Sequence, residues 1–266
     1  MAIYYPAGAF TDEQLSKPYL FEYHYIGTAA ASTAQAGFAA AAPLNELTYE
    51  RWRPTALPAT WTTDLGSARS INYCAIAAHT LYYKNIAIQS SADNVAWTTR
   101  HSISPTDNSP IVVMFPTVSA RYWRLNITAG TNATYGATIP SVGVVFFGTY
   151  LQMQQRIEVG ISPISLSRKT VYSGNTSEGG NWLGRSVKRT GKTGQIPLKA
   201  IARDWYQSTL DPALQRMRYK PFFFASCPKA MPWDVSYCWL TDDPKPVTVG
   251  GMLMDVTLNV EAHAHE

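Results

Sequence analysis

The segment 190–193 has the Gly-Lys-Thr sequence that ends a phosphate-binding loop. Such a loop needs a further glycine five residues before Gly191, because its backbone amides must wrap closely around the phosphates. Ser186 occupies that position. The chain also has no nucleophile elbow, no metalloprotease helix and no dinucleotide fingerprint, and its carboxylates are too scattered for a glycosidase pair. The sequence therefore predicts a protein that is not an enzyme.

Two histidines near the end of the chain have metal-ligand spacing. His263 and His265 lie two apart, so their side chains share one face of an extended strand, beside Glu261. The alternative is a polar segment that faces solvent or a neighbouring molecule, which is the commoner role of such residues. We therefore predict no metal site, and the role of the two histidines stays open.

Basic residues cluster in the second half of the chain. Residues 168–220 contain eleven Lys or Arg and three acidic residues. Nucleic acid binds such clusters, but Trp182, Trp205 and Tyr206 do not form the stacking pattern of a single-strand binder. We therefore expect contact with acidic faces of neighbouring subunits and no nucleic acid. The predicted interface residues are Arg185, Lys188, Arg189 and Lys192.

Composition bounds the class of protein. The chain has 266 residues, 46% apolar and 15% charged, which is long enough for one large or two modest domains and too apolar for disorder. Three cysteines are too few for a disulfide framework, although a Cys227–Cys238 bridge across a hairpin is one alternative. The sequence has no recognisable secretory leader and no apolar segment of membrane-spanning length. We expect folding in a reducing cytoplasm and no membrane contact.

The first half has the pattern of short antiparallel strands. Residues 121–127 alternate between apolar and polar side chains, as in a strand with one buried face. Continuous apolar runs at 111–115 and 142–147 are typical of strands between packed layers. We predict a β-sandwich over residues 44–150, preceded by an N-terminal arm and a loosely structured lead-in over residues 1–43.

Residues 151–266 are predicted to form a smaller α+β domain with antiparallel strands and one main helix. Residues 171–193 are Gly-rich and basic, as in a long hairpin or loop. Apolar residues recur at helical spacing from Leu198 to Trp205, and a second short helix is expected to begin at Asp211, before a proline. Strands are expected at 221–224, 236–240 and 254–260.

A series of aromatic and glycine landmarks runs through the first half in a fixed order. They are Trp61, Asp64-Leu65-Gly66, Tyr73–Ala77, His79-Thr80-Leu81, Ile86–Asp93, Trp97, Ala120–Leu125 and Phe146-Phe147-Gly148. In order and spacing this series resembles the discoidin family, or coagulation-factor C-type domains, which is related to galactose-binding carbohydrate modules. The resemblance covers roughly a hundred residues and implies a galactose-binding-like antiparallel β-sandwich, with Trp97 and Trp123 filling the space between two sheets.

The loops of the predicted sandwich provide the candidate ligand-binding residues. Sugar recognition needs an aromatic platform and hydrogen-bonding groups at one rim of the sandwich. The loop residues that we select for this role are His79, Tyr82, Tyr83, Asn132 and Tyr135. Loop packing or contact with a neighbouring subunit is their alternative role. Many relatives bind calcium through an Asp-Gly turn, but residues 45–52 lack that turn, so calcium is not favoured and no cofactor is expected.

The second half resembles small structural proteins of bacteriophage tails. The features are the basic hairpin, the amphipathic helix and the strand at 221–224. The resemblance implies a virion protein of a tail tip or baseplate, similar to distal or minor tail proteins and made in the bacterial host cytoplasm. Other tail subunits would be its partners, in a homo-oligomeric ring, and host surface polysaccharide would be a ligand of the sandwich. The alternative is a stand-alone lectin, or a carbohydrate-binding module accessory to a polysaccharide-degrading enzyme.

Overall fold

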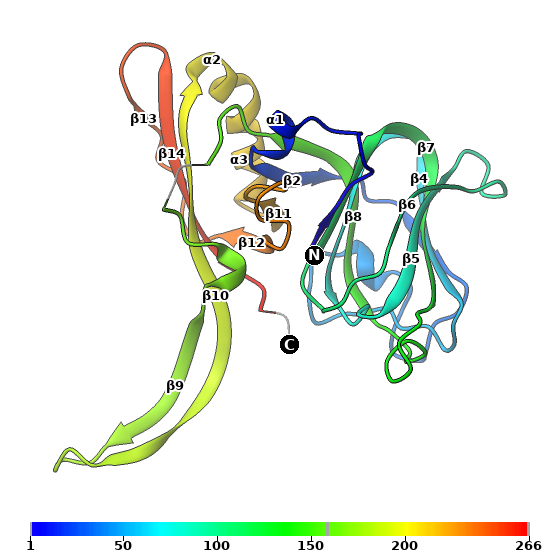
Figure 1. Ribbon diagram of the computed structural model, residues 1–266, viewed down its shortest axis with the longest axis horizontal. Coiled ribbons are helices and arrows are strands. Elements are labelled where there is room, and N and C mark those ends of the chain that lie inside the picture. The colour runs from blue at the N-terminus through cyan, green and yellow to red at the C-terminus, as the bar shows by residue number, and fades with distance from the viewer. Residues whose placement is uncertain (1, 158–159, 265–266) are drawn as a thin grey trace.

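A computed structural model describes residues 2–157 and 160–264, and within them one sheet runs through both halves of the chain (Figure 1). Its main path is β6-β5-β7-β4-β8-β2-β11-β12-β14-β10-β9, and its pairings are antiparallel apart from that of β1 with β7. The strands are β1 (Ile3–Tyr4), β2 (Tyr19–His24), β3 (Thr28–Ala31), β4 (Ala59–His79), β5 (Lys84–Ser91), β6 (Thr98–Ile103), β7 (Ile111–Ala129), β8 (Val142–Gln152), β9 (Lys169–Thr176), β10 (Trp182–Ala202), β11 (Phe222–Ala225), β12 (Val235–Leu240), β13 (Val247–Thr248) and β14 (Leu253–Ala262). The helical elements are α1 (Asp12–Leu15), η1 (Ala42–Leu44), η2 (Ile164–Leu166), α2 (Arg203–Trp205), η3 (Tyr206–Leu210) and α3 (Asp211–Met217). The predicted fold class, mainly antiparallel β with one main helix, is confirmed.

The first half forms two layers because its two longest strands bend from one layer into the other. β4 and β7 pair along most of their length, with a register break between Asp64 and Arg69. Before this break β4 also pairs with β3, and after it with β8. Irregularities of this kind increase the local twist and turn a long strand around a corner. The largest side chains buried between the layers are Trp52, Trp61, Phe115, Trp123 and Phe147.

Two expectations about the first half need correction. Trp97 is not part of the core but lies half-buried in the loop before β6, where its ring centroid is 4.0 Å from the guanidinium carbon of Arg124. Arg124 points outward because Trp123 and Leu125 occupy the inner face of β7, and side chains alternate along a strand. The lead-in is more ordered than predicted, since Thr28–Ala31 form β3 and pair with β4.

The second half packs one helical segment against the sheet. α2, η3 and α3 follow one another without a break, and Leu210, Leu214 and Met217 are buried in a core shared with β2, β10, β11 and β14. The predicted helix from Asp211 is confirmed. The helix expected between Leu198 and Trp205 is wrong over most of its length, because β10 continues to Ala202.

A bulge explains the misleading pattern at the end of β10. The register of β10 on β14 shifts between Leu198 and Ile201, and Ala200 has a left-handed backbone with φ of 51°. The inserted residue places two inward-facing side chains, Leu198 and Ile201, three positions apart instead of two. A bulged strand therefore reproduces the spacing of an amphipathic helix.

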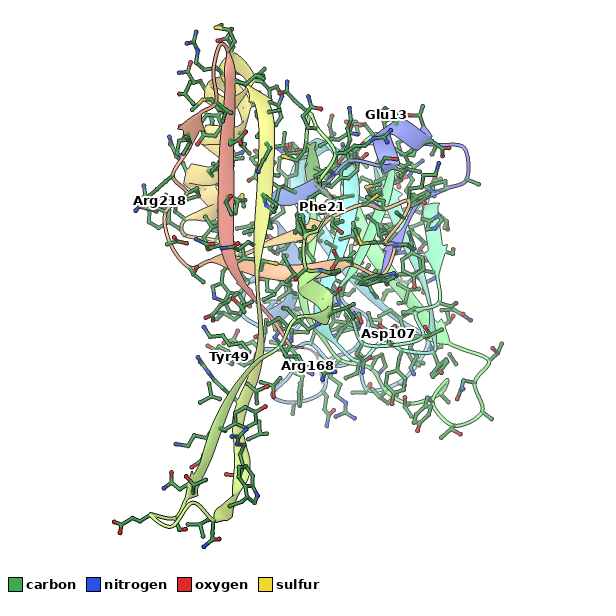
Figure 2. All side chains as sticks on the ribbon, turned by 60° about the vertical axis from the view of Figure 1, so that its left-hand side comes forward. Glu13, Phe21, Tyr49, Asp107, Arg168 and Arg218 are labelled. Atoms are coloured by element: carbon green, nitrogen blue, oxygen red, sulfur yellow. The ribbon has the colours of Figure 1, made fainter. Side chains whose placement is uncertain are left out.

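Residues 169–191, called the arm below, stand clear of the rest of the molecule. They comprise β9, the turn after it and the first part of β10, and these two strands pair only with each other until β10 joins β14 at Lys192. Figure 2 shows side chains of both faces of the arm in solvent, with Arg168 labelled at its base. Of the two alternatives predicted for residues 171–193, a long hairpin or a loop, the structure has the hairpin.

Two further features concern the chain as a whole. All three cysteines are free, so the alternative Cys227–Cys238 bridge is not formed, and Cys238 lies instead opposite Phe222 in the β11–β12 pair. None of the helices in the described residues has the length and apolar character required to cross a membrane.

Candidate functional site

Three tyrosines form an aromatic cluster at one rim of the sandwich. Tyr82 and Tyr83 precede β5, and Tyr135 lies in the loop that follows β7. The ring centroids of Tyr83 and Tyr135 are 6.0 Å apart with nearly parallel planes, and Tyr82 lies 5.1 Å from Tyr135. Tyr135 is 43% exposed. This group, called the tyrosine rim below, comes from two loops that are far apart in the sequence.

Tyr83 is held in a backbone conformation that bulky residues rarely adopt. Its φ is +57°, in the left-handed region, and its amide donates to the carbonyl of Pro105 at 2.6 Å. The backbone of Gly130 passes so close that a Cβ there would lie 2.0 Å from the carbonyl oxygen of Tyr83. Strained residues are maintained only where the surroundings fix them, and they concentrate at functional sites.

A buried lysine joins the two loops of the tyrosine rim. The Lys84 side chain has no exposed surface, and its ammonium donates to the backbone carbonyl of Tyr135 and to the Thr138 hydroxyl at 3.0 Å. Burial lowers the pKa of Lys84, because removal from water disfavours the charged form. The sequence analysis did not select this residue. One feature of the sequence could have identified Lys84. It lies two residues before Ile86 in the predicted strand, so its side chain points to the same inward face.

The remaining two predicted residues have structural contacts. Asn132 shapes the loop that carries Tyr135, because its Oδ1 accepts the amides of Thr134 and Tyr135 at 3.1 and 2.9 Å. His79 is 3% exposed, its Nε2 lies 2.9 Å from the carbonyl oxygen of Ser109, and its Nδ1 accepts the Leu81 amide at 3.2 Å. We therefore place His79 outside the candidate site, since a ligand cannot reach its ring.

The tyrosine rim has the chemistry that sugar rings require. Aromatic faces pack against the C–H face of a pyranose, while phenol hydroxyls and backbone groups bond its hydroxyls.

The predicted interface residues all lie on β10. Arg185, Lys188 and Arg189 are exposed along the arm. Lys192 differs from them, because it is half-buried where β10 meets β14, and this burial lowers its pKa. The three arm residues therefore remain available for a partner, whereas Lys192 belongs to the base of the arm.

Two of the residues considered for metal or calcium, Glu261 and Glu50, bond to other side chains. Glu261 forms an ion pair with Lys169, His263 donates its amide to Tyr237, and His265 lies outside the described residues. In residues 2–157 and 160–264, no three His, Cys, Asp or Glu side chains gather as a metal site would require. In residues 45–52, for which calcium was not favoured, the Asn45 amide donates to Glu50 at 2.5 Å.

Comparison with known proteins identifies the first half. The sequence model of the F5/8 type C domain matches residues 28–139. No curated protein matches the chain. Among solved structures, chitosan-binding module 1 of a chitosanase/glucanase from Paenibacillus sp. IK-5 is 22% identical with a TM-score of 0.42, and the match covers 47% of this chain and 97% of that one. The family 32 carbohydrate-binding module of NanJ from Clostridium perfringens, solved with galactose, is 18% identical with a TM-score of 0.40, covering 48% of this chain and 98% of that one. The first half therefore has the discoidin-like, galactose-binding-like fold that its landmarks predicted.

Proposed function

We propose that the chain is a non-catalytic carbohydrate-binding protein whose sandwich binds glycans at the tyrosine rim. The observation that carries this proposal is the meeting of Tyr82, Tyr83 and Tyr135 at one rim, with Tyr83 held in a left-handed backbone conformation. Tyr135 is 43% exposed and Tyr82 and Tyr83 are half-buried beside it, so the cluster presents aromatic surface to solvent where a ligand can reach it. The match of residues 28–139 to the F5/8 type C domain supports the same proposal.

A glycan array followed by calorimetry with the best ligand tests this function. We expect Tyr83→Ala and Tyr135→Ala each to weaken binding about tenfold, because one aromatic–sugar contact contributes on the order of 1 kcal/mol. Tyr219→Ala is the matched control, since Tyr219 is 83% exposed but follows α3 in the second half. Thermal unfolding of each variant checks that the sandwich is intact. An array without any bound glycan, or rim variants that bind as the parent does, would refute the proposal.

We also propose that the second half incorporates the chain into a larger assembly, as a structural subunit of a virion tail tip or baseplate beside other tail subunits. The observation that favours assembly is the arm, which exposes large apolar side chains on a two-stranded ribbon. Such a ribbon has no core of its own and is at best marginally stable in water. The virion location rests on the sequence resemblance of the second half.

Amide hydrogen exchange tests the assembly role. We expect the arm amides of the dilute chain to exchange rapidly, and those of the concentrated or assembled protein to become protected. An arm that exchanges at the same fast rate under all conditions, also in the presence of other tail subunits, would refute this role and leave glycan binding untouched.

A further inference from the structure

Two groups of exposed apolar side chains lie at opposite ends of the second half, while others, among them Leu166 and Tyr219, lie elsewhere on its surface. At one end lies the arm, with Val171, Tyr172, Trp182, Leu183 and Val187 between 36% and 66% exposed. At the other end is the β13–β14 turn, with Val247, Val249, Met252 and Leu253 between 41% and 61% exposed. β10 runs between the two ends (Figure 1). Apolar patches of this kind on a soluble surface mark contacts with other molecules.

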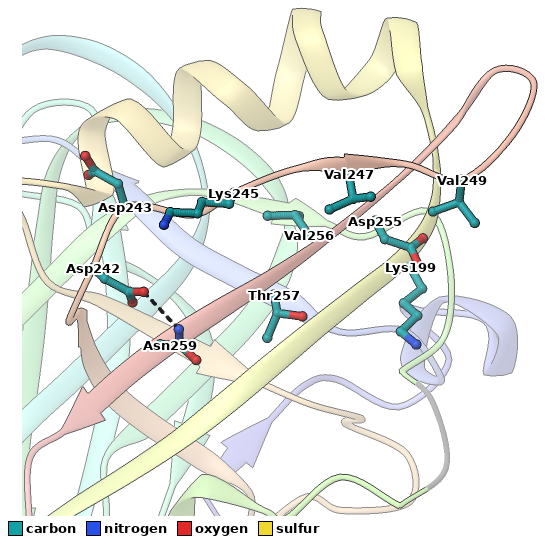
Figure 3. A pocket seen from close by; sticks show the side chains of 10 residues that line it. All are labelled: Lys199, Asp242, Asp243, Lys245, Val247, Val249, Asp255, Val256, Thr257 and Asn259. Atoms are coloured by element: carbon teal, nitrogen blue, oxygen red, sulfur yellow. Dashed lines mark hydrogen bonds between the residues drawn. The ribbon is translucent and has the colours of Figure 1, made fainter.

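A groove lined with carboxylates lies beside the second patch (Figure 3). Its volume is about 440 Å³, and its charged lining residues are Lys199, Asp242, Asp243, Lys245 and Asp255. Asp243 pairs with Arg218 at 2.9 Å. In the part of the chain that the structure describes, Asp242 and Asp255 have no Lys or Arg nitrogen within 4.0 Å, and they accept hydrogen bonds from an asparagine amide and a backbone amide instead. The groove, called the aspartate groove below, therefore contains three carboxylates, two of them without an ion-pair partner among the described residues, together with two lysines and exposed valines.

The arm carries most of the net charge of the chain. It contains four basic residues and one acidic residue, out of 22 basic and 18 acidic residues in the whole chain, so that 18 and 17 remain elsewhere. Two arms would therefore repel each other electrostatically. The rest of the chain is nearly neutral, so its net charge attracts the arm only weakly. A local cluster of carboxylates is what the arm requires.

Arg185 is the arm residue whose side chain is best positioned to bind a carboxylate. Its guanidinium carbon lies 4.3 Å from the ring centroid of Tyr172 and 5.1 Å from that of Trp182. Contact with these two rings holds the planar donor group in place and supplies apolar surface next to it. The aspartate groove offers the complement at one end, where Asp255 lies opposite Val247 in the β13–β14 pair and close to Val249 (Figure 3).

The groove of the same copy is out of reach for this face of the arm. Arg185 and Lys199 both lie on β10, and the intervening extended strand separates them by roughly 45 Å. We infer that the Arg185 face of the arm docks into the aspartate groove of a second copy of this chain. This inference rests on the proposed assembly role. The contact joins two different surfaces, so repetition closes a ring or extends a filament.

Charge reversal combined with sedimentation analysis tests this contact in the full chain. We expect Arg185→Glu and Asp242→Arg each to weaken self-association at least about tenfold, because each places like charges in contact. An equimolar mixture of the two variants should assemble again, since the acidic arm of one fits the basic groove of the other. Arg189→Glu and Asp204→Arg are matched controls, expected to change the affinity by less than about threefold.

The Arg189 control depends on the register of the arm. Arg185 lies opposite Gly174 and Arg189 opposite Val171, so the two arginines occupy opposite faces of the ribbon. Asp204 is an 80% exposed carboxylate on α2, outside the groove.

Each outcome of this experiment has a definite meaning. Loss of assembly in both variants and its recovery in the mixture would support the contact. Assembly that both variants retain, or that Arg189→Glu disrupts equally, would overturn the contact and leave the assembly role intact. A parent chain that stays monomeric at roughly 100 μM, above the range of specific interfaces, would also overturn it. Glycan binding measured on the same samples separates these results from failure of the tyrosine rim.

Discussion

His24 shows how a single residue at the junction of the two halves makes stability depend on pH. It lies on β2, between β8 and β11, and its ring stacks on Phe146 with centroids 3.7 Å apart. The charged groups that face it are Glu46, at 3.6 Å, and Lys220, which itself lies 3.0 Å from the Glu46 carboxylate. A distance of 3.6 Å is too long for a hydrogen bond. Burial therefore dominates and lowers the pKa of His24 from 6.5 to about 4.

We predict that the free energy of unfolding falls as the pH decreases from 6.5 to 4. In this window the unfolded chain binds a proton at His24 while the folded chain does not, so acid favours unfolding by at most about 3 kcal/mol. Urea titrations at several pH values measure the slope. His24→Phe retains the stacked ring and removes the titration, so its slope should be smaller. Parallel pH profiles of the two proteins would show that other groups cause the effect.

Local sequence spacing predicts the orientation of some residues, whereas the role of others depends on contacts with distant parts of the chain. The alternation around Trp123 depends only on local spacing, and the structure confirms its inward direction. His79 and Tyr82 look alike as polar residues in one loop region, yet one is buried and the other lies at the rim. What separates them is the position of the segment around Ser109, which lies far along the chain. Lys84 escaped notice for the same reason, because its partners Tyr135 and Thr138 are on another loop.

At the level of elements, the bulge in β10 is the feature that local spacing misrepresents. Ala200 has φ of 51°, and its amide donates to Asp255 at 2.8 Å. The spacing of Leu198 and Ile201 alone does not distinguish a helix from a strand that gains one residue. Pairing with β14 decides between helix and strand at this position. The inward residues of β14, Val256 and Leu258, lie opposite β10 and require an extended partner.

The same bulge predicts a stabilising substitution. A residue with a Cβ is strained in the left-handed region, whereas glycine is not, so Ala200→Gly should raise the free energy of unfolding by up to about 1 kcal/mol. Ala30→Gly is the control, because Ala30 is exposed in the regular strand β3 and should lose about 0.5–1 kcal/mol there. Chemical denaturation of the three proteins gives the comparison. Equal destabilisation by both glycines would mean that the backbone at Ala200 is not strained.

At the scale of the whole molecule, the two halves are joined more closely than the composition suggested. The sequence predicts a sandwich followed by an α+β domain, but β2 from the beginning of the chain pairs with both β8 and β11. Phe21 lies opposite Phe223 in this pairing. Such contacts between remote segments leave no periodic signal in either strand. One sheet therefore carries the tyrosine rim and the arm on the same framework.

The arm is the part of this framework that the fold does not need. None of its residues belongs to the three buried apolar clusters, and the nearest member on β10 is Ile196. Val171 and Arg189 lie opposite each other across the hairpin, so a two-residue Asn-Gly turn can connect them in place of residues 172–188. We predict that this shortened chain retains its free energy of unfolding within about 1 kcal/mol and binds glycans with unchanged affinity, because no buried contact is removed. Self-association should be abolished, as sedimentation analysis would show. A shortened chain that unfolds cooperatively, binds glycans and still assembles would demonstrate that the copies meet through another surface.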